Sequence, residues 1–205
     1  MGKRLLPFRQ YNEHDVINMF ALEDASVNEN ITGFGSGDAG VFVKVSAGNL
    51  DLDPVTYGSN SYLGKTDYPF VGSNAYPSVS LKIAPAASGD IKPLGITLFE
   101  TAKYDENGEK LLYYKQKAMD HQVLLPGQAV PVATRGVFTV SARAYDGTLS
   151  VGGGFKLSAT AGKITGAALT DSAAIGTILA TGSRGANGAT IADTFSGNYA
   201  IIKLG

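Results

Sequence analysis

The sequence predicts an all-β protein: a β-barrel or sandwich with an extended N-terminal arm and a small glycine-rich C-terminal β lobe. Its 205 residues include 26 glycines and 8 prolines, scattered among short Val, Ile, Thr, Tyr and Phe runs, which is typical of many short strands joined by turns. Helical periodicity is scarce. In addition, residues 40–47, 136–142 and, more loosely, 154–159 each consist of a glycine, an apolar run and small residues.

The individual elements follow from these apolar runs. Residues 13–22 fit a short amphipathic helix capped by Asn12 and a strand through 16–22 about equally well. Strands are predicted at 41–45, 79–83, 95–99, 110–114, 129–134, 137–142, 175–180 and 199–204. Asn107-Gly108 tolerates the positive φ of a tight turn, so the runs at 95–99 and 110–114 are predicted to form a hairpin. The alanine-rich segment 167–174 predicts one helical turn, and residues 152–154 and 182–188 predict flexible loops.

Composition divides the chain into three parts. Residues 1–38 are an N-terminal arm and a glycine-rich joint, 39–147 a main β domain with a long loop at 51–78, and 148–205 a C-terminal β lobe with few charges. A longer repeat is also visible, because residues 40–50 and 92–98 resemble residues 153–164 and 174–179. The repeat fits a duplication, and it equally fits chance similarity within a glycine-rich β sequence.

Charge and composition narrow the partners. The 17 basic and 18 acidic side chains nearly balance, whereas a nucleic-acid-binding protein usually has a basic excess. No apolar stretch approaches the ~20 residues of a membrane span. We therefore expect neither nucleic acid nor membrane as a partner, and a soluble chain without a signal peptide. Charged residues make up only 17% of the chain, which suits a protein that is covered by partners or by its own copies.

The sequence does not predict an enzyme. Its two histidines lie in His14-Asp15 and Asp120-His121, whereas a catalytic base and its orienting acid usually converge from separate parts of a fold. Residues 51–53 and 105–109 carry carboxylates without the spacing of a calcium loop. The chain has no cysteine. We expect no catalytic residue, no metal and no cofactor.

The arm is the best candidate binding segment. It combines cations, apolar groups and aromatic rings, and arginine and aromatic residues are enriched at interface hot spots. A frayed terminus is the alternative, but apolar side chains around Pro7 are costly to leave in water, so we expect the arm to dock on a partner. The candidate partner-binding residues are Lys3, Arg4, Leu5, Leu6, Phe8, Arg9 and Tyr11.

One part of the chain resembles a known family. Residues 126–140 combine a glycine, alternating valines and a Gly-Val-Phe strand, and they are followed by a Gly-Lys-Ile run at 162–164, an Ile-Gly-Thr-Ile-Leu run at 175–179 and the closing strand at 199–204. Together these segments resemble the capsid decoration, or cement, proteins of tailed bacteriophages. The likeness covers about residues 123–205. Residues 6–11 are also similar to the openings of head proteins in marine phages, whereas residues 51–120 depart from the decoration pattern.

The resemblance implies a small β-barrel and a structural role. It implies a virion protein, made in the host cytoplasm, that binds the major capsid protein on the outer capsid surface, often as a trimer, and stabilises the shell by bridging neighbouring subunits. Simultaneous modest contacts to several subunits would raise the avidity. Two alternatives stay open: a tail-tube or fibre component, and a carbohydrate-binding β module that uses Tyr57, Tyr62, Tyr68 and Tyr76.

Overall fold

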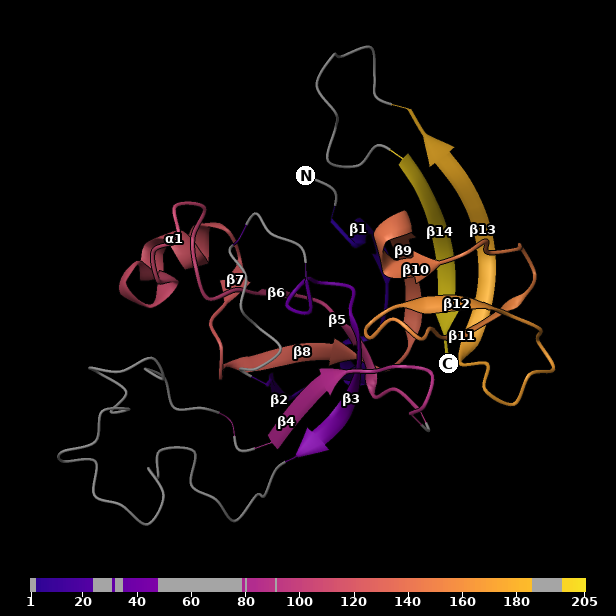
Figure 1. The fold of residues 1–205 in the computed structure, drawn as a ribbon, viewed down its shortest axis with the longest axis horizontal. Coiled ribbons are helices and arrows are strands. Elements are labelled where there is room, and N and C mark those ends of the chain that lie inside the picture. Colours follow the sequence, from indigo (N-terminus) through magenta and orange to yellow (C-terminus); the bar gives the residue numbers. More distant parts are fainter. Residues whose placement is uncertain are drawn as a thin grey trace.

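The computed structural model describes residues 3–23, 31, 35–47, 79, 81–90, 92–185 and 197–205. This part of the chain is built almost entirely from strands, which confirms the predicted all-β fold (Figure 1). It forms a seven-stranded sheet, a closed five-stranded barrel and a two-stranded sheet. The predicted loop at 51–78, with its four tyrosines and the carboxylates of 51–53, lies outside the described residues.

The barrel closes in the order β2-β4-β3-β5-β8. Its strands are β2 (Val16–Leu22), β3 (Phe42–Ala47), β4 (Leu81–Pro85), β5 (Gly95–Thr97) and β8 (Ala129–Ala133). β2 and β4 run parallel, and the other neighbours run antiparallel. A buried aliphatic cluster of Leu22, Val41, Val43, Ile83, Val130 and Val132 belongs to these strands and the residue before β3.

The first barrel strand resolves the open choice at residues 13–22. A short 3-10 turn, η1 (Glu13–Asp15), precedes β2, and the Asn12 side chain accepts a hydrogen bond from the backbone N–H of His14. Residues 16–22 are then extended, because their backbone pairs with β8 on one side and β4 on the other. The cap at Asn12 is therefore confirmed, but it caps a single turn rather than an amphipathic helix.

The seven-stranded sheet has the order β1-β9-β14-β13-β11-β12-β10. Its strands are β1 (Leu5–Gln10), β9 (Gly136–Ser141), β10 (Tyr145–Asp146), β11 (Gly154–Leu157), β12 (Ile164–Ala167), β13 (Gly176–Arg184) and β14 (Gly197–Leu204). All neighbours are antiparallel except β10 and β12. The sheet thus joins strands from the predicted arm, main domain and C-terminal lobe.

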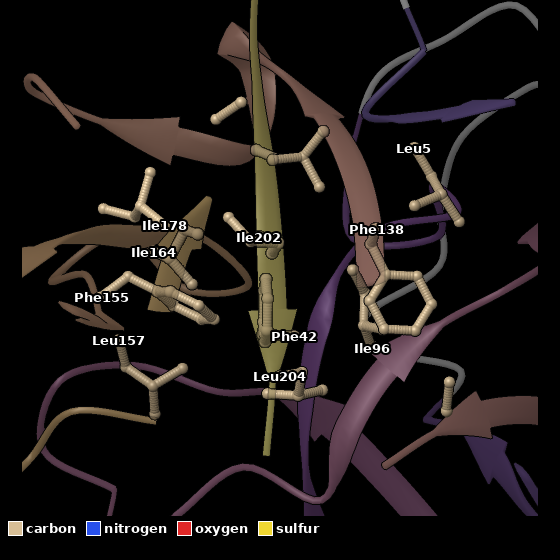
Figure 2. Close-up of a cluster of buried hydrophobic side chains, with 14 of the residues drawn as sticks. Leu5, Phe42, Ile96, Phe138, Phe155, Leu157, Ile164, Ile178, Ile202 and Leu204 are labelled. Carbon is tan, nitrogen blue, oxygen red and sulfur yellow. The ribbon is translucent and has the colours of Figure 1, made fainter. Parts of the chain in front are cut away.

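A continuous apolar core joins the sheet to the barrel. Figure 2 shows barrel side chains such as Phe42 and Ile96 among side chains of the sheet such as Phe138, Phe155 and Ile202. The Phe42 and Phe155 rings meet edge to face with their centroids 6.1 Å apart. All five side chains are fully buried. This shared core fixes the sheet and the barrel against each other.

The predicted hairpin at 95–114 is wrong beyond its turn. Gly108 does take a positive φ of 84°, and Tyr104 and Lys110 form an isolated antiparallel bridge. However, the chain then enters a 3-10 turn, η3 (Leu111–Tyr113), and a short helix, α1 (Lys115–Asp120), instead of a strand. The Lys117 ammonium bonds to the carboxylate of Asp105 at 2.9 Å and so holds the helix against the turn.

This helical segment has a small core of its own. Leu111, Ala118 and Val123 are buried together with Ala102 and Leu125. The segment connects β6 (Glu100–Thr101) to β7 (Val123–Leu124), and these two strands form the two-stranded parallel sheet. Leu111 is buried against residues that precede it and residues that follow it in the chain. This local burial explains why the apolar run at 110–114 does not form a strand.

Three further expectations need adjustment. The predicted helical turn at 167–174 is absent, because Ala167 ends β12 and residues 168–174 form separate turns. Gly182 and the two residues after it belong to β13 instead of a loop, and 186–188 lie outside the described residues. Gly154 begins β11.

The long repeat coincides with repeated strand pairing. β3 pairs with β5 and β11 pairs with β13, both antiparallel. In each pair the second strand begins with a glycine, Gly95 or Gly176, where an added Cβ would lie 2.1 Å from a carbonyl oxygen of the next strand.

Candidate interaction surface

The N-terminal arm is an ordered edge strand of the protein's own sheet. β1 pairs antiparallel with β9, and Leu5 lies opposite Val140 while Arg9 lies opposite Phe138. The register shifts between these two pairs, where Pro7 provides no backbone N–H for the ladder. Leu5 is only 5% exposed and belongs to the main core. This leucine docks on the protein itself.

Two ion pairs hold the start of this strand. The Arg4 guanidinium lies 2.9 Å from the Asp38 carboxylate, and both side chains are about 10% exposed (11% and 10%). The Lys3 ammonium lies 3.8 Å from Glu100 and is mostly exposed. Burial raises the pKa of Asp38, and the attraction of Arg4 opposes this rise. Burial likewise raises the pKa of Glu100, against the weaker effect of Lys3.

The joint after the arm is shaped to receive β1. The backbone carbonyl of Asp38 accepts a hydrogen bond from the buried Thr97 hydroxyl at 3.0 Å. Gly40 has a φ of +93°, and a Cβ there would lie 2.9 Å from the Leu5 backbone nitrogen. Glycine is therefore required at this position both for its backbone conformation and for the close approach of β1.

One groove runs along β1 on the side of the helical segment. Its volume is about 550 Å³, and its walls come from β1, from the residues around β6 and from the end of α1. Lys3, Arg9 and Glu100 supply its charges, and His121 lines it as well. The Arg9 guanidinium donates to the Leu98 carbonyl oxygen at 3.3 Å. The groove therefore combines charged and polar groups with apolar side chains such as Leu98 and Phe99.

A second groove is more apolar and has a volume of about 430 Å³. Leu6, Pro7 and Phe8 from β1 line it together with Tyr199 from β14. Leu6 is 8% exposed, so it forms part of the groove wall and does not project from the surface. The hydroxyl of Thr139, on β9, lines the same region and has no hydrogen-bond partner.

Among the described residues of the arm, Phe8 is the most exposed aromatic side chain, at 62%. Tyr11 is 41% exposed, and its ring stacks on Phe138 with the centroids 5.9 Å apart. Of the seven predicted site residues, Arg4, Leu5 and Leu6 are thus occupied inside the protein. Lys3, Phe8, Arg9 and Tyr11 form the accessible part, which we call the β1 surface.

Sequence reasoning missed the partners of the arm. Asp38 was a recognisable signal, because it is the only charged residue between Glu29 and Lys44 and precedes an apolar run. An isolated acid in such a setting is usually paired when it becomes buried. Glu100, Thr139 and Tyr199 carry no comparable signal, since only the tertiary fold brings them to β1.

The described residues offer no group of three or more His, Asp or Glu side chains that could hold a metal ion. His14 and His121 are both exposed. Among the helices of this part of the chain, none is long and apolar enough to cross a membrane. No family model, no curated protein and no solved structure matches this chain.

Proposed function

We propose that this chain is a structural virion protein that binds the outer surface of a bacteriophage capsid and stabilises the shell by bridging neighbouring major capsid protein subunits. The capsid is proposed as the partner because residues 123–205 resemble the capsid decoration proteins of tailed bacteriophages. The observation that supports an adhesive role is the exposure of Phe8 on a fixed strand, where Phe8 lines the more apolar groove and Arg9 lines the other groove along β1.

Phe8 has the properties of an anchor residue. Hot spots lie in well-packed pockets of an interface and are often aromatic, and phenylalanine is among the residues enriched at interfaces. β1 is fixed by its pairing with β9 and by the buried Arg4–Asp38 pair, so little backbone entropy remains to be lost on binding. The two grooves could each receive a side chain from a different neighbour, and such double engagement raises the avidity.

The contact differs from the one expected from sequence. A free arm would wrap a partner with Leu5 and Leu6, whereas these side chains are buried in the protein itself. The proposed capsid contact therefore uses the β1 surface as a rigid ridge. The exposed cations of this surface, Lys3 and Arg9, would lie at the rim of the contact, where charges affect the association rate more than the affinity.

Co-sedimentation with capsid shells that lack the protein tests the proposal. Phe8→Ala should weaken binding by at least about 30-fold, the effect of losing a hot spot of about 2 kcal/mol. Val151→Ala is the matched control, because Val151 is equally exposed at 61% but precedes β11. Equal binding of both variants would refute the role of the β1 surface. Failure of the wild-type protein to bind shells, with assembly into rings or rods instead, would favour a tail component, and glycan binding would favour the carbohydrate-binding alternative.

A further inference from the structure

The edges of the sheets are mostly closed, blocked or very short in the described part of the chain. The barrel is closed and so has no free edge. At one end of the seven-stranded sheet, β1 carries Pro7, a residue that blocks strand addition. At the other end, β10 is only two residues long, as are β6 and β7. One long unblocked edge remains, on β13.

β13 extends past one of its two neighbours. β14 pairs with it from Gly176 to Arg184, with a register shift between Ile178 and Ala180 that leaves Leu179 unmatched on β14, but β11 pairs only with Gly176 and Thr177. The last backbone hydrogen bonds on the β11 side involve Ile178. From Leu179 to Ser183, no described strand lies on this outer side, and the upper part of β13 borders the molecule in Figure 1. We call Leu179–Ser183 the open edge.

The residues of the open edge suit strand pairing. They read Leu-Ala-Thr-Gly-Ser, with neither a proline nor a charge to prevent the addition of a strand. Leu179, Thr181 and Ser183 are exposed. Residues 180–183 pair with β14 in regular register, and the outer side of such an edge presents unpaired backbone N–H and C=O groups in the spacing of a β ladder. The chemistry that satisfies them is another extended backbone.

We propose that the open edge pairs with the open edge of a second copy of this chain, antiparallel about a two-fold axis at Thr181. An axis perpendicular to the sheet keeps each side chain on its own face, so Thr181 lies opposite Thr181 of the second copy. Ala180 then lies opposite Gly182, and Leu179 opposite Ser183. These pairs place no like charges against each other, and Thr–Thr pairs stabilise antiparallel strands.

The second copy is the occupant that the sequence of the edge favours. A two-fold contact uses one patch twice, so the patch must be complementary to itself. The open edge meets this condition, because small residues oppose small residues about Thr181 and the larger Leu179 opposes Ser183. The pairing would join two seven-stranded sheets into one. It gives a dimer rather than the trimer that the family resemblance implies, and it does not depend on capsid binding.

A single cysteine tests the register directly. The chain has no cysteine of its own, so Thr181→Cys introduces one thiol per copy. Directly opposite Cα atoms in antiparallel strands are about 4.5–5.5 Å apart, which a disulfide can span. Mild oxidation should therefore link T181C into a dimer at least about tenfold faster than Thr160→Cys, a control at another exposed position. Equal rates for the two variants would overturn the proposed pairing.

A charge at the axis tests the same contact without chemistry. Thr181→Glu places two carboxylates opposite each other, which destabilises the pair, whereas Thr160→Glu leaves the edge unchanged. In sedimentation experiments the wild-type protein and T160E should be dimers at tens of micromolar concentration and T181E a monomer, with the same circular dichroism spectrum for all three. A monomeric wild-type protein would overturn the proposal and leave the open edge to an extended segment of a different protein. An oligomer that T181E leaves intact would overturn it as well.

Discussion

The substitution Leu5→Ala tests whether the N-terminal strand is part of the folded core. Leu5 is 5% exposed and packs in the main core beside Gly40. The change removes three buried carbon groups, which contribute about 0.8 kcal/mol each by transfer, or about 2.4 kcal/mol together. The cavity left behind adds to this cost. We expect the free energy of unfolding to fall by about 3 kcal/mol.

Urea unfolding followed by circular dichroism measures this loss. The midpoint should decrease without a change in slope, because the amount of surface exposed on unfolding stays nearly the same. For a chain of this length, about 3 kcal/mol corresponds to a decrease of about 6–12 °C in melting temperature. Phe8→Ala is the control on the same strand, since Phe8 is 62% exposed and should cost no more than about 0.5 kcal/mol.

The contrast between the two variants carries the test. If the arm were a free segment, Leu5→Ala would be as harmless to stability as Phe8→Ala. A difference below about 0.5 kcal/mol between them would therefore refute the docked strand, and with it the proposed rigid β1 surface.

Three other outcomes follow from the same structure. Gly95→Ala should lower stability by at least about 1–3 kcal/mol, because the new Cβ would lie 2.1 Å from the Ala133 carbonyl oxygen, whereas Gly89→Ala meets nothing within 4 Å and is a neutral control in the same melting assay. The Ser158 hydrogen bond lowers the pKa of Asp146 to about 2. The stability that the ionised carboxylate of Asp146 contributes to the fold should therefore be lost as the pH falls from about 4 towards 2. In Asp146→Asn, the melting temperature should depend less on pH in this range. Burial raises the pKa of Glu100, so the folded state is stabilised when Glu100 is protonated and loses this stabilisation as the pH rises. Because glutamine stays neutral, Glu100→Gln should melt at a higher temperature than the wild-type protein at pH 7.

The docked strand changes how the N-terminal residues relate to function. Basic and apolar residues in a terminal segment predict a binding arm when the segment is considered alone. In the fold, Arg4 is used to pair a buried acid and Leu5 to fill the core. What remains available to a partner is the other set of side chains, Phe8 and Tyr11 above all.

The strands that could be predicted from sequence are those with an apolar run and no nearby residues that draw the run into a different local structure. The strands at 129–134, 137–142 and 199–204 match β8, β9 and β14 closely, because each run buries several apolar side chains in the barrel or the sheet, at alternate positions along β14. The run at 110–114 failed because Leu111 found a local core and Lys117 an acid partner in the preceding turn. Neither contact is encoded in a periodicity of 2 or 3.6 residues.

The sequence by itself determined the class of fold, most strand positions and the absence of cysteine chemistry, because apolar runs, turn residues and composition act locally. The tertiary structure alone decided which strands became neighbours: it placed β1 beside β9, closed the barrel and, among the described residues, left β13 beyond Ile178 without a strand on one side. Pairing between strands depends on contacts over long sequence separations, and the two surfaces proposed to bind partners, the β1 surface and the open edge, exist only after that pairing is complete.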